Sequence, residues 1–145
     1  MRLRRGEARD ADELGRIKHA CYSRMTYLPP IPTIDEYRRH VREDLLPAQD
    51  VWVAEDEGRV VGWWSMTEGS LEHIYVDPEL QNRGLGSAML AKVMELMPDG
   101  FSLWTFQKNV GARRFYERHG FRAVELTDGS GNMEREPDVR FEWRP

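Results

Sequence analysis

A turn with two glycines, at residues 81–86, is the stretch of this sequence best suited to chemistry. It reads QNRGLG, and the spacing of apolar residues predicts a strand before it, over 71–76, and a helix after it. Glycines let a backbone approach a ligand closely, and the first N–H groups of a helix are unpaired and favour negative charge. Arg83 adds a positive charge at the same place. The sequence therefore predicts a site for a phosphate or pyrophosphate group.

Two common patterns of phosphate-binding loops are absent. GxxxxGK[ST] does not occur, and GxGxxG fails because Gly86 is followed by Ser87, Ala88 and Met89. No Walker lysine or ribose-binding acidic residue supports a nucleotide-phosphate-binding domain. The pattern present is Gln-x-x-Gly-x-Gly, preceded by a strand that ends in Ile-Tyr-Val-Asp-Pro at 74–78.

The elements that would position this turn are strands and helices of ordinary length. Capping boxes at 10–13 and 33–36 predict two helices in the first third of the chain. A helix between the strands at 71–76 and 101–106 makes a β–α–β unit, which implies two parallel strands. Strands are expected over 1–6, 50–55, 59–67, 71–76, 101–106, 121–126 and 139–143.

Composition limits the class of protein. The chain has 145 residues, enough for one domain over 1–145, and its net charge is 21 − 25 = −4, which does not suggest a nucleic-acid-binding surface. No apolar run approaches the ~20 residues of a membrane span, and the N-terminus lacks the apolar region of a secretory signal. Cys21 stands alone, so neither a disulfide framework nor a cysteine metal site is expected. We expect a cytoplasmic protein without a metal.

A second motif lies downstream. Asn109 is a good helix N-cap, Gly120 sits where a C′ glycine belongs, and between them the chain reads Asn-x-x-Ala-x-x-Phe-Tyr-Glu-x-x-Gly-Phe over 109–121. Asn109 follows Gly86 by 23 residues (109 − 86). In order and separation, the two motifs resemble the two signatures of the GNAT superfamily of N-acetyltransferases, and the resemblance covers essentially the whole chain.

The resemblance implies a fold and a reaction. The fold would be α/β (α+β), with a mixed, mostly antiparallel sheet of six or seven strands, helices on both faces and a central parallel pair that splays apart. The activity would be acetyl transfer from acetyl-CoA to a primary amine by direct attack in a ternary complex.

It also implies roles for residues of both motifs. Tyr116 would lie near the thioester sulfur and give the leaving thiolate a proton, since a phenol has an ordinary pKa of about 10. The residues implied to bind the cofactor are Ile74, Val76, Gln81, Arg83, Gly84, Leu85, Gly86, Ser87 and Asn109.

A general base is expected on the strand at 71–76. Strand alternation places Glu72 with Ile74 and Val76 on one face, and His73 with Leu71 on the other. Glu72 is preferred as the base that takes a proton from the ammonium, directly or through water, followed by His73. Further residues that could touch the acceptor, although packing is the favoured explanation of each, are Tyr22, Tyr27, Trp64 and His73.

Other interpretations stay open at this stage. A non-catalytic GNAT-fold module could bind an acyl-CoA as a sensor or interaction partner, although the presence of Tyr116 and Glu72 argues against it. The acceptor could be a small-molecule or peptide amine, and acidic residues such as Glu55, Glu57 and Glu68 near the expected mouth would attract a cationic one. Exposed strand edges make a homodimer possible.

Overall fold

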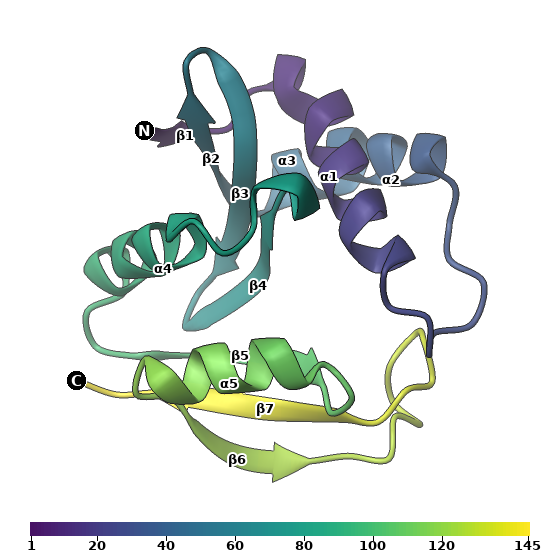
Figure 1. Ribbon diagram of the computed structural model, residues 1–145, viewed down its shortest axis with the longest axis vertical. Helices are drawn as coiled ribbons and strands as arrows, with labels where there is room; N and C mark the ends of the chain where they lie inside the picture. The colour runs from purple at the N-terminus through teal and green to yellow at the C-terminus, as the bar shows by residue number, and fades with distance from the viewer.

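One mixed sheet of seven strands, in the order β1-β2-β3-β4-β5-β7-β6, organises the computed structural model, which describes residues 1–145 (Figure 1). Every neighbouring pair is antiparallel except β4 and β5, which are parallel. This arrangement confirms the predicted fold and the β–α–β unit. The strands are β1 (Arg2–Arg5), β2 (Asp50–Asp56), β3 (Arg59–Thr67), β4 (Ser70–Val76), β5 (Phe101–Phe106), β6 (Arg122–Leu126) and β7 (Asp138–Trp143).

Helices cover both faces of the sheet. The helix expected after residue 33 is α-helical only to His40 and continues as a π-helical segment, η2 (Val41–Leu45). None of the helices is long and apolar enough to cross a membrane. The α-helices are α1 (Ala11–Ser23), α2 (Ile34–His40), α3 (Leu46–Ala48), α4 (Leu85–Leu96) and α5 (Val110–Arg118), and the short 3₁₀ helices are η1 (Ala8–Asp10) and η3 (Pro78–Leu80).

The two faces of the sheet bury separate cores. Trp64 packs with α4 and α5, whereas its neighbour Trp63 packs with α1 and donates its indole N–H to the Leu14 carbonyl at 3.1 Å. Both tryptophans are fully buried. Trp64 stacks on Trp52 inside its core, and this burial favours packing over the predicted contact with an acceptor.

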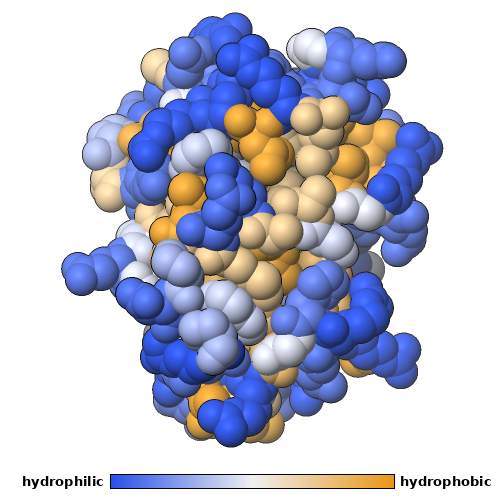
Figure 2. Space-filling view, turned by 90° about the vertical axis from the view of Figure 1, so that its left-hand side faces the viewer, coloured by the Kyte–Doolittle hydropathy of each residue, from blue (hydrophilic) through white to orange (hydrophobic).

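Helix α4 completes the first of these cores. Figure 2 views the side of the molecule where α4 lies and shows apolar residues gathered across its middle, between more polar regions above and below. The buried residues Met89, Leu90 and Val93 point from this helix into the core. The helix that follows the glycine turn is therefore fixed by apolar burial along its length, which holds its first turn in place.

A bulge in β4 changes the predicted alternation. Ser65 pairs with His73, but the next residue of β3, Met66, pairs with Leu71, so Glu72 is the extra residue. Leu71 consequently packs in the same core as Ile74 rather than on the face of His73. The prediction that Leu71 shares a face with His73 is wrong, because a bulge shifts every side chain beyond it to the other face.

The two capping boxes have different outcomes. Thr33 and Glu36 cap α2 reciprocally, as predicted. The box expected at 10–13 does not form, because both carboxylate oxygens of Asp10 accept hydrogen bonds from the Arg4 guanidinium at 2.9 Å. Asp10 also accepts the Glu7 N–H at 2.8 Å, so it closes a capping box with Glu7 instead of one with Glu13.

Candidate active site

A cleft of about 1120 Å³ opens where β4 and β5 separate. The two parallel strands are paired only between Ser70 and Ser102, and beyond this point they are held apart. Residues of α1, β4, the turn before α4, β5 and α5 line the cleft. The lining includes most of the residues predicted from the sequence, namely Tyr22, Tyr27, Glu72, His73, Ile74, Val76, Gln81, Gly84, Leu85, Gly86, Ser87, Asn109 and Tyr116. Arg83 is exposed at the turn but outside the lining.

The turn before α4 presents unpaired backbone donors to this cleft. Gly84 has φ +80°, a left-handed conformation that favours glycine, and it is the N-cap of α4. The first backbone hydrogen bond of the helix runs from Ala88 N–H to the Gly84 carbonyl. The N–H groups of Leu85, Gly86 and Ser87 therefore have no acceptor in the protein, and a pyrophosphate fits this set of donors.

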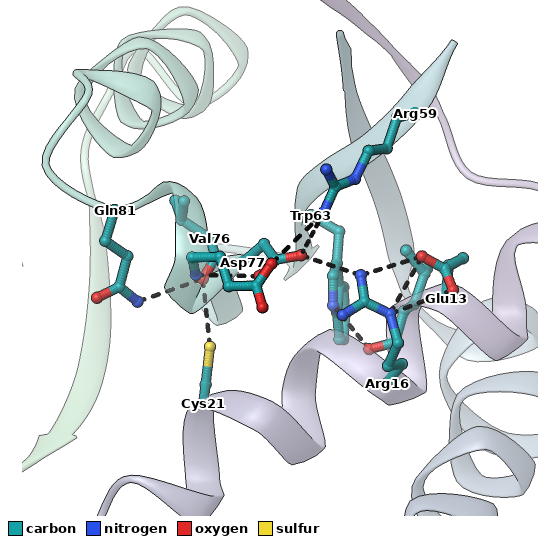
Figure 3. Close-up of polar contacts among 10 residues, drawn as sticks. Glu13, Arg16, Cys21, Arg59, Trp63, Val76, Asp77 and Gln81 are labelled. Carbon is teal, nitrogen blue, oxygen red and sulfur yellow. Dashed lines mark hydrogen bonds and ion pairs between the residues drawn. The ribbon is translucent and has the colours of Figure 1, made fainter.

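The end of β4 is fixed from both sides, as Figure 3 shows. The Val76 carbonyl accepts from the Gln81 side-chain amide at 3.3 Å and from the Cys21 thiol at 3.3 Å. Burial raises the pKa of the Cys21 thiol to about 12, so this group stays a protonated donor and not a nucleophile. Cys21 thus ties α1 to the strand that leads into the glycine turn.

Asp77 anchors the same corner through charge. It is 1% exposed and accepts hydrogen bonds from Arg16 at 3.0 Å, from Arg59 at 3.5 Å and from the Glu79 N–H at 3.1 Å (Figure 3). Burial alone would raise the pKa of Asp77, but the hydrogen bonds from Arg16 and Glu79 outweigh it and the pKa lies below its usual value. An ionised Asp77 therefore holds β4, α1 and the start of the turn together.

Tyr116 projects from α5 into the cleft. Its ring is packed against Phe115, Phe121 and Phe141, with centroid separations of 5.4–5.9 Å. Its hydroxyl makes no hydrogen bond within the protein, although the side chain lines the cleft. Burial raises the pKa of Tyr116 above its ordinary value, so the phenol keeps its proton at neutral pH. The residue is thus a protonated donor with a free hydroxyl.

Asn109 has a structural role that leaves half of its amide free. Its side-chain oxygen accepts from the Ala112 N–H at 3.1 Å, which caps α5 as predicted. The amide nitrogen makes no hydrogen bond in the protein, and the residue lines the cleft. That nitrogen is available to a ligand.

The two candidates for a base lie in different environments. Glu72, at the bulge, is exposed, lines the cleft and accepts from the Thr67 hydroxyl at 2.7 Å. His73 is hydrogen-bonded to the Tyr75 hydroxyl at 2.8 Å and lies against the Trp63 ring. Burial, with the charge of the nearby Lys18, lowers the pKa of His73 to about 3, which makes it a poor base.

Aromatic side chains bridge the two separated strands near the end of α1. The Tyr22 ring meets Tyr75 of β4 at 6.0 Å and Phe106 of β5 at 6.3 Å, and Tyr27 meets Phe106 at 6.0 Å. Burial raises the pKa of Tyr27 to about 12. The roles of Phe106 and of the half-exposed Trp104 in the cleft wall were missed from the sequence, since an alternating strand gives no signal of which partner faces it across the sheet.

A mixed sheet with one splayed parallel pair, and a donor-rich turn at the mouth of the splay, define an α/β domain whose cleft suits an anionic ligand. The family model for the acetyltransferase (GNAT) domain matches residues 47–123, and the chain belongs to this family. This confirms the resemblance seen in the two motifs.

Known proteins agree with this assignment. Over 86 residues the chain is 35% identical to the peptidyl-lysine N-acetyltransferase YiaC of Escherichia coli K12, an alignment that covers 59% of this chain and 58% of that protein. The chain spans 57–63% of the length of the first curated relatives it matches. Two solved structures share the fold: apo YjaB of Escherichia coli (TM-score 0.78, 20% identity, 98% and 96% of the chains), and YncA of Salmonella typhimurium with its cofactor acetyl-CoA (0.74, 18%, 99% and 93%).

Proposed function

We propose that residues 1–145 act as one acetyl-CoA-dependent N-acetyltransferase domain, which transfers an acetyl group to a primary amine by direct attack in a ternary complex. One observation carries the proposal: the unpaired N–H groups of 85–87 and the free hydroxyl of Tyr116 open onto the same cleft. The name of the relative YiaC, a peptidyl-lysine N-acetyltransferase, supports an amine as acceptor.

The glycine turn would hold the pyrophosphate of acetyl-CoA. Leu85, Gly86 and Ser87 offer free N–H groups, and the left-handed Gly84 lets the backbone come close. When bound, acetyl-CoA supplies an activated acyl thioester. Val76 and Ile74 on the open edge of β4, the Asn109 amide, and the Gln81 side chain would contact its arm, and the exposed Arg83 adds charge at the rim.

Tyr116 would hold the proton that the leaving thiolate needs. Its hydroxyl has no competing partner in the protein, and its pKa is raised by burial, so the proton is present across the physiological range. A positioned general acid of this kind contributes about 10²–10⁴ in rate.

Glu72 would take the proton that the acceptor ammonium must lose before it can attack. It is the one carboxylate in the cleft lining, whereas the cations of the lining are Arg24, Lys108, Arg114 and Arg118. The Thr67 hydroxyl fixes its orientation. His73, the second choice, is disfavoured by its lowered pKa of about 3.

The residues that line the cleft carry fewer acidic side chains than the sequence predicted around the acceptor. Glu55 is held by Arg4 at 3.2 Å, and Glu57 and Glu68 do not line the cleft, so the predicted acidic mouth does not form. The electrostatic attraction for a cationic amine would therefore come from Glu72. The aromatic side chains of Tyr22, Tyr27 and Phe106 would contact the carbon chain of the amine.

Turnover with a panel of amines tests the proposal. Acetyl-CoA would be incubated with a polyamine, free amino acids, a lysine peptide blocked at its N-terminus and a lysine-free peptide with a free N-terminus. We expect release of free thiol, and an acetylated product by mass spectrometry, with at least one acceptor. Binding of acetyl-CoA without thiol release across the panel would contradict the proposal and point to a non-catalytic acyl-CoA-binding module.

A further inference from the structure

His119 joins the end of α5 to the first turn of α4. Its Nδ1 lies 2.8 Å from the Phe115 carbonyl oxygen, and its Nε2 lies 3.1 Å from the Ser87 hydroxyl oxygen. Its ring also lies 4.5 Å from the Phe115 ring, centroid to centroid. Both ring nitrogens of this half-buried histidine therefore have a defined partner.

The partners determine where the ring carries hydrogen. A carbonyl oxygen can only accept, so Nδ1 must donate to Phe115. In the neutral ring Nε2 is then an acceptor, and the Ser87 hydroxyl must donate to it. When the ring is protonated the second bond reverses, because Nε2 becomes a donor to the Ser87 oxygen.

Ser87 is also part of the proposed pyrophosphate site. It is the third residue of α4, its backbone N–H is free, and it lines the cleft. With neutral His119, its hydroxyl hydrogen points at the imidazole, and lone pairs of the oxygen face the cleft. Lone pairs repel a phosphate oxygen, so this arrangement opposes the anion that the neighbouring N–H groups attract.

We propose that His119 is a positioning residue of the pyrophosphate site and takes up a proton when the ligand binds. One proton from solvent joins Nε2, which donates to the Ser87 oxygen. The Ser87 hydroxyl hydrogen turns to a phosphate oxygen, and no bond of the ligand is made or broken. The inference rests on the turn at 81–87 being the pyrophosphate site and is independent of the catalytic roles proposed above.

No acidic side chain near His119 competes with the ligand as the partner of a protonated ring, so ligand binding and protonation of His119 are coupled. The first turn of α4 has no acidic residue to stabilise an imidazolium. On α5 the sequence neighbours of His119 are Glu117 and Arg118, both exposed, and Arg118 lines the cleft together with Arg114. A bound pyrophosphate places negative charge beside the Ser87 hydroxyl, and it therefore favours the protonated ring. Affinity should accordingly increase as pH falls.

Calorimetry with dephospho-CoA tests this inference. This probe keeps the pyrophosphate but lacks the 3′-phosphate, which itself titrates near neutral pH. Binding would be measured at pH 7 in two buffers with different ionisation enthalpies. We expect a net uptake of protons, seen as a binding enthalpy that depends on the ionisation enthalpy of the buffer. The affinity should also decrease several-fold between pH 6 and pH 8.

Variants separate this linkage from a merely structural role. His119→Gln keeps a neutral hydrogen-bonding side chain and should abolish both the proton uptake and the pH dependence, and Ser87→Ala should do the same. His40→Gln is the matched control, since His40 lies on α2 and pairs with Asp44, and it should keep the uptake. If the variants fail to fold, the His119 imidazole resonances of the wild-type protein should shift toward the protonated form when dephospho-CoA is added near pH 7.

Uptake that is zero in the wild-type protein, or unchanged in His119→Gln, would overturn the inference while leaving the pyrophosphate site intact. An unmoved imidazole resonance on binding would overturn it equally. The absence of any binding of dephospho-CoA would instead refute the pyrophosphate site itself.

Discussion

Replacing Tyr116 with phenylalanine should separate catalysis from packing. The hydroxyl makes no hydrogen bond within the protein, whereas the ring is packed among three other aromatic rings. Tyr116→Phe keeps those ring contacts and removes only a hydroxyl that opens onto the cleft. Because no hydrogen bond and no ring contact is lost, the free energy of unfolding should change by less than about 1 kcal/mol.

Activity should respond very differently. Loss of a general acid reduces the rate by about 10²–10⁴, so thiol release should fall at least roughly a hundredfold. Binding of CoA should be unchanged, because the substitution does not alter the backbone donors of the glycine turn at 84–87. The assay is single-turnover thiol release at saturating acetyl-CoA, with binding and thermal unfolding measured on the same samples.

Tyr37 offers a matched control. It is 6% exposed, close to the 7% of Tyr116, but lies on α2 outside the cleft lining, where it packs on the outer side of Tyr22. Tyr37→Phe should change neither rate nor CoA affinity. A Tyr116→Phe protein that binds CoA and turns over at the wild-type rate would refute the role given to this hydroxyl.

Three further predictions concern the surroundings of the cleft. Gly84→Ala should lower the free energy of unfolding by about 1 kcal/mol, because its backbone is left-handed, and should also weaken CoA binding. Gly58→Ala, at φ +77° in a remote turn, should lower the free energy of unfolding equally and leave the CoA affinity unchanged. Equal CoA affinities of the two variants would contradict the account. Thr67→Val should lower the rate of acetyl transfer, because it removes the hydroxyl that orients the Glu72 carboxylate, whereas Thr67→Ser should keep the wild-type rate. A variant that loses CoA affinity and keeps its rate would argue for a structural role of Thr67. Asp77→Asn should reduce the free energy of unfolding by about 2 kcal/mol at pH 7. Since the folded-state pKa of Asp77 is lowered, its contribution is present above the unfolded-state pKa of about 4 and is lost as pH falls through the folded-state value, so the difference between the two proteins should shrink in acid denaturation.

Local patterns in the sequence were sufficient for the elements and for much of the site. The strand, glycine turn and helix over 71–96 depend on nearby residues, and so does the helix that Asn109 caps and Gly120 ends. Their order implied a parallel pair, and these features could be predicted because short-range capping, turn and periodicity rules govern them. Only the resemblance of the two motifs to the GNAT signatures placed Tyr116 and the turn at one site.

Features set by pairing between distant segments could not be predicted. The bulge at Glu72 depends on how β3 and β4 align. Asp10 does not cap α1, because its carboxylate binds the Arg4 guanidinium and the Glu7 N–H. Trp63 and Trp64 point to opposite faces of β3, but the sequence alone does not say which face packs against α4 and α5. His119 falls at a position that the second motif leaves open, so its contact with Ser87 appears only once α4 and α5 are packed together.

Thermal unfolding with acetyl-CoA, CoA and ATP in parallel tests the central claim that the turn at 81–87 is the pyrophosphate site of an acetyl-CoA-dependent enzyme. A ligand present at 100 times its dissociation constant adds about 2.7 kcal/mol to the free energy of unfolding, which for a domain of this size corresponds to a shift of roughly 5–10 °C. We predict such a shift with acetyl-CoA and CoA and none with ATP. No shift with acetyl-CoA, or an equal shift with ATP, would contradict the account.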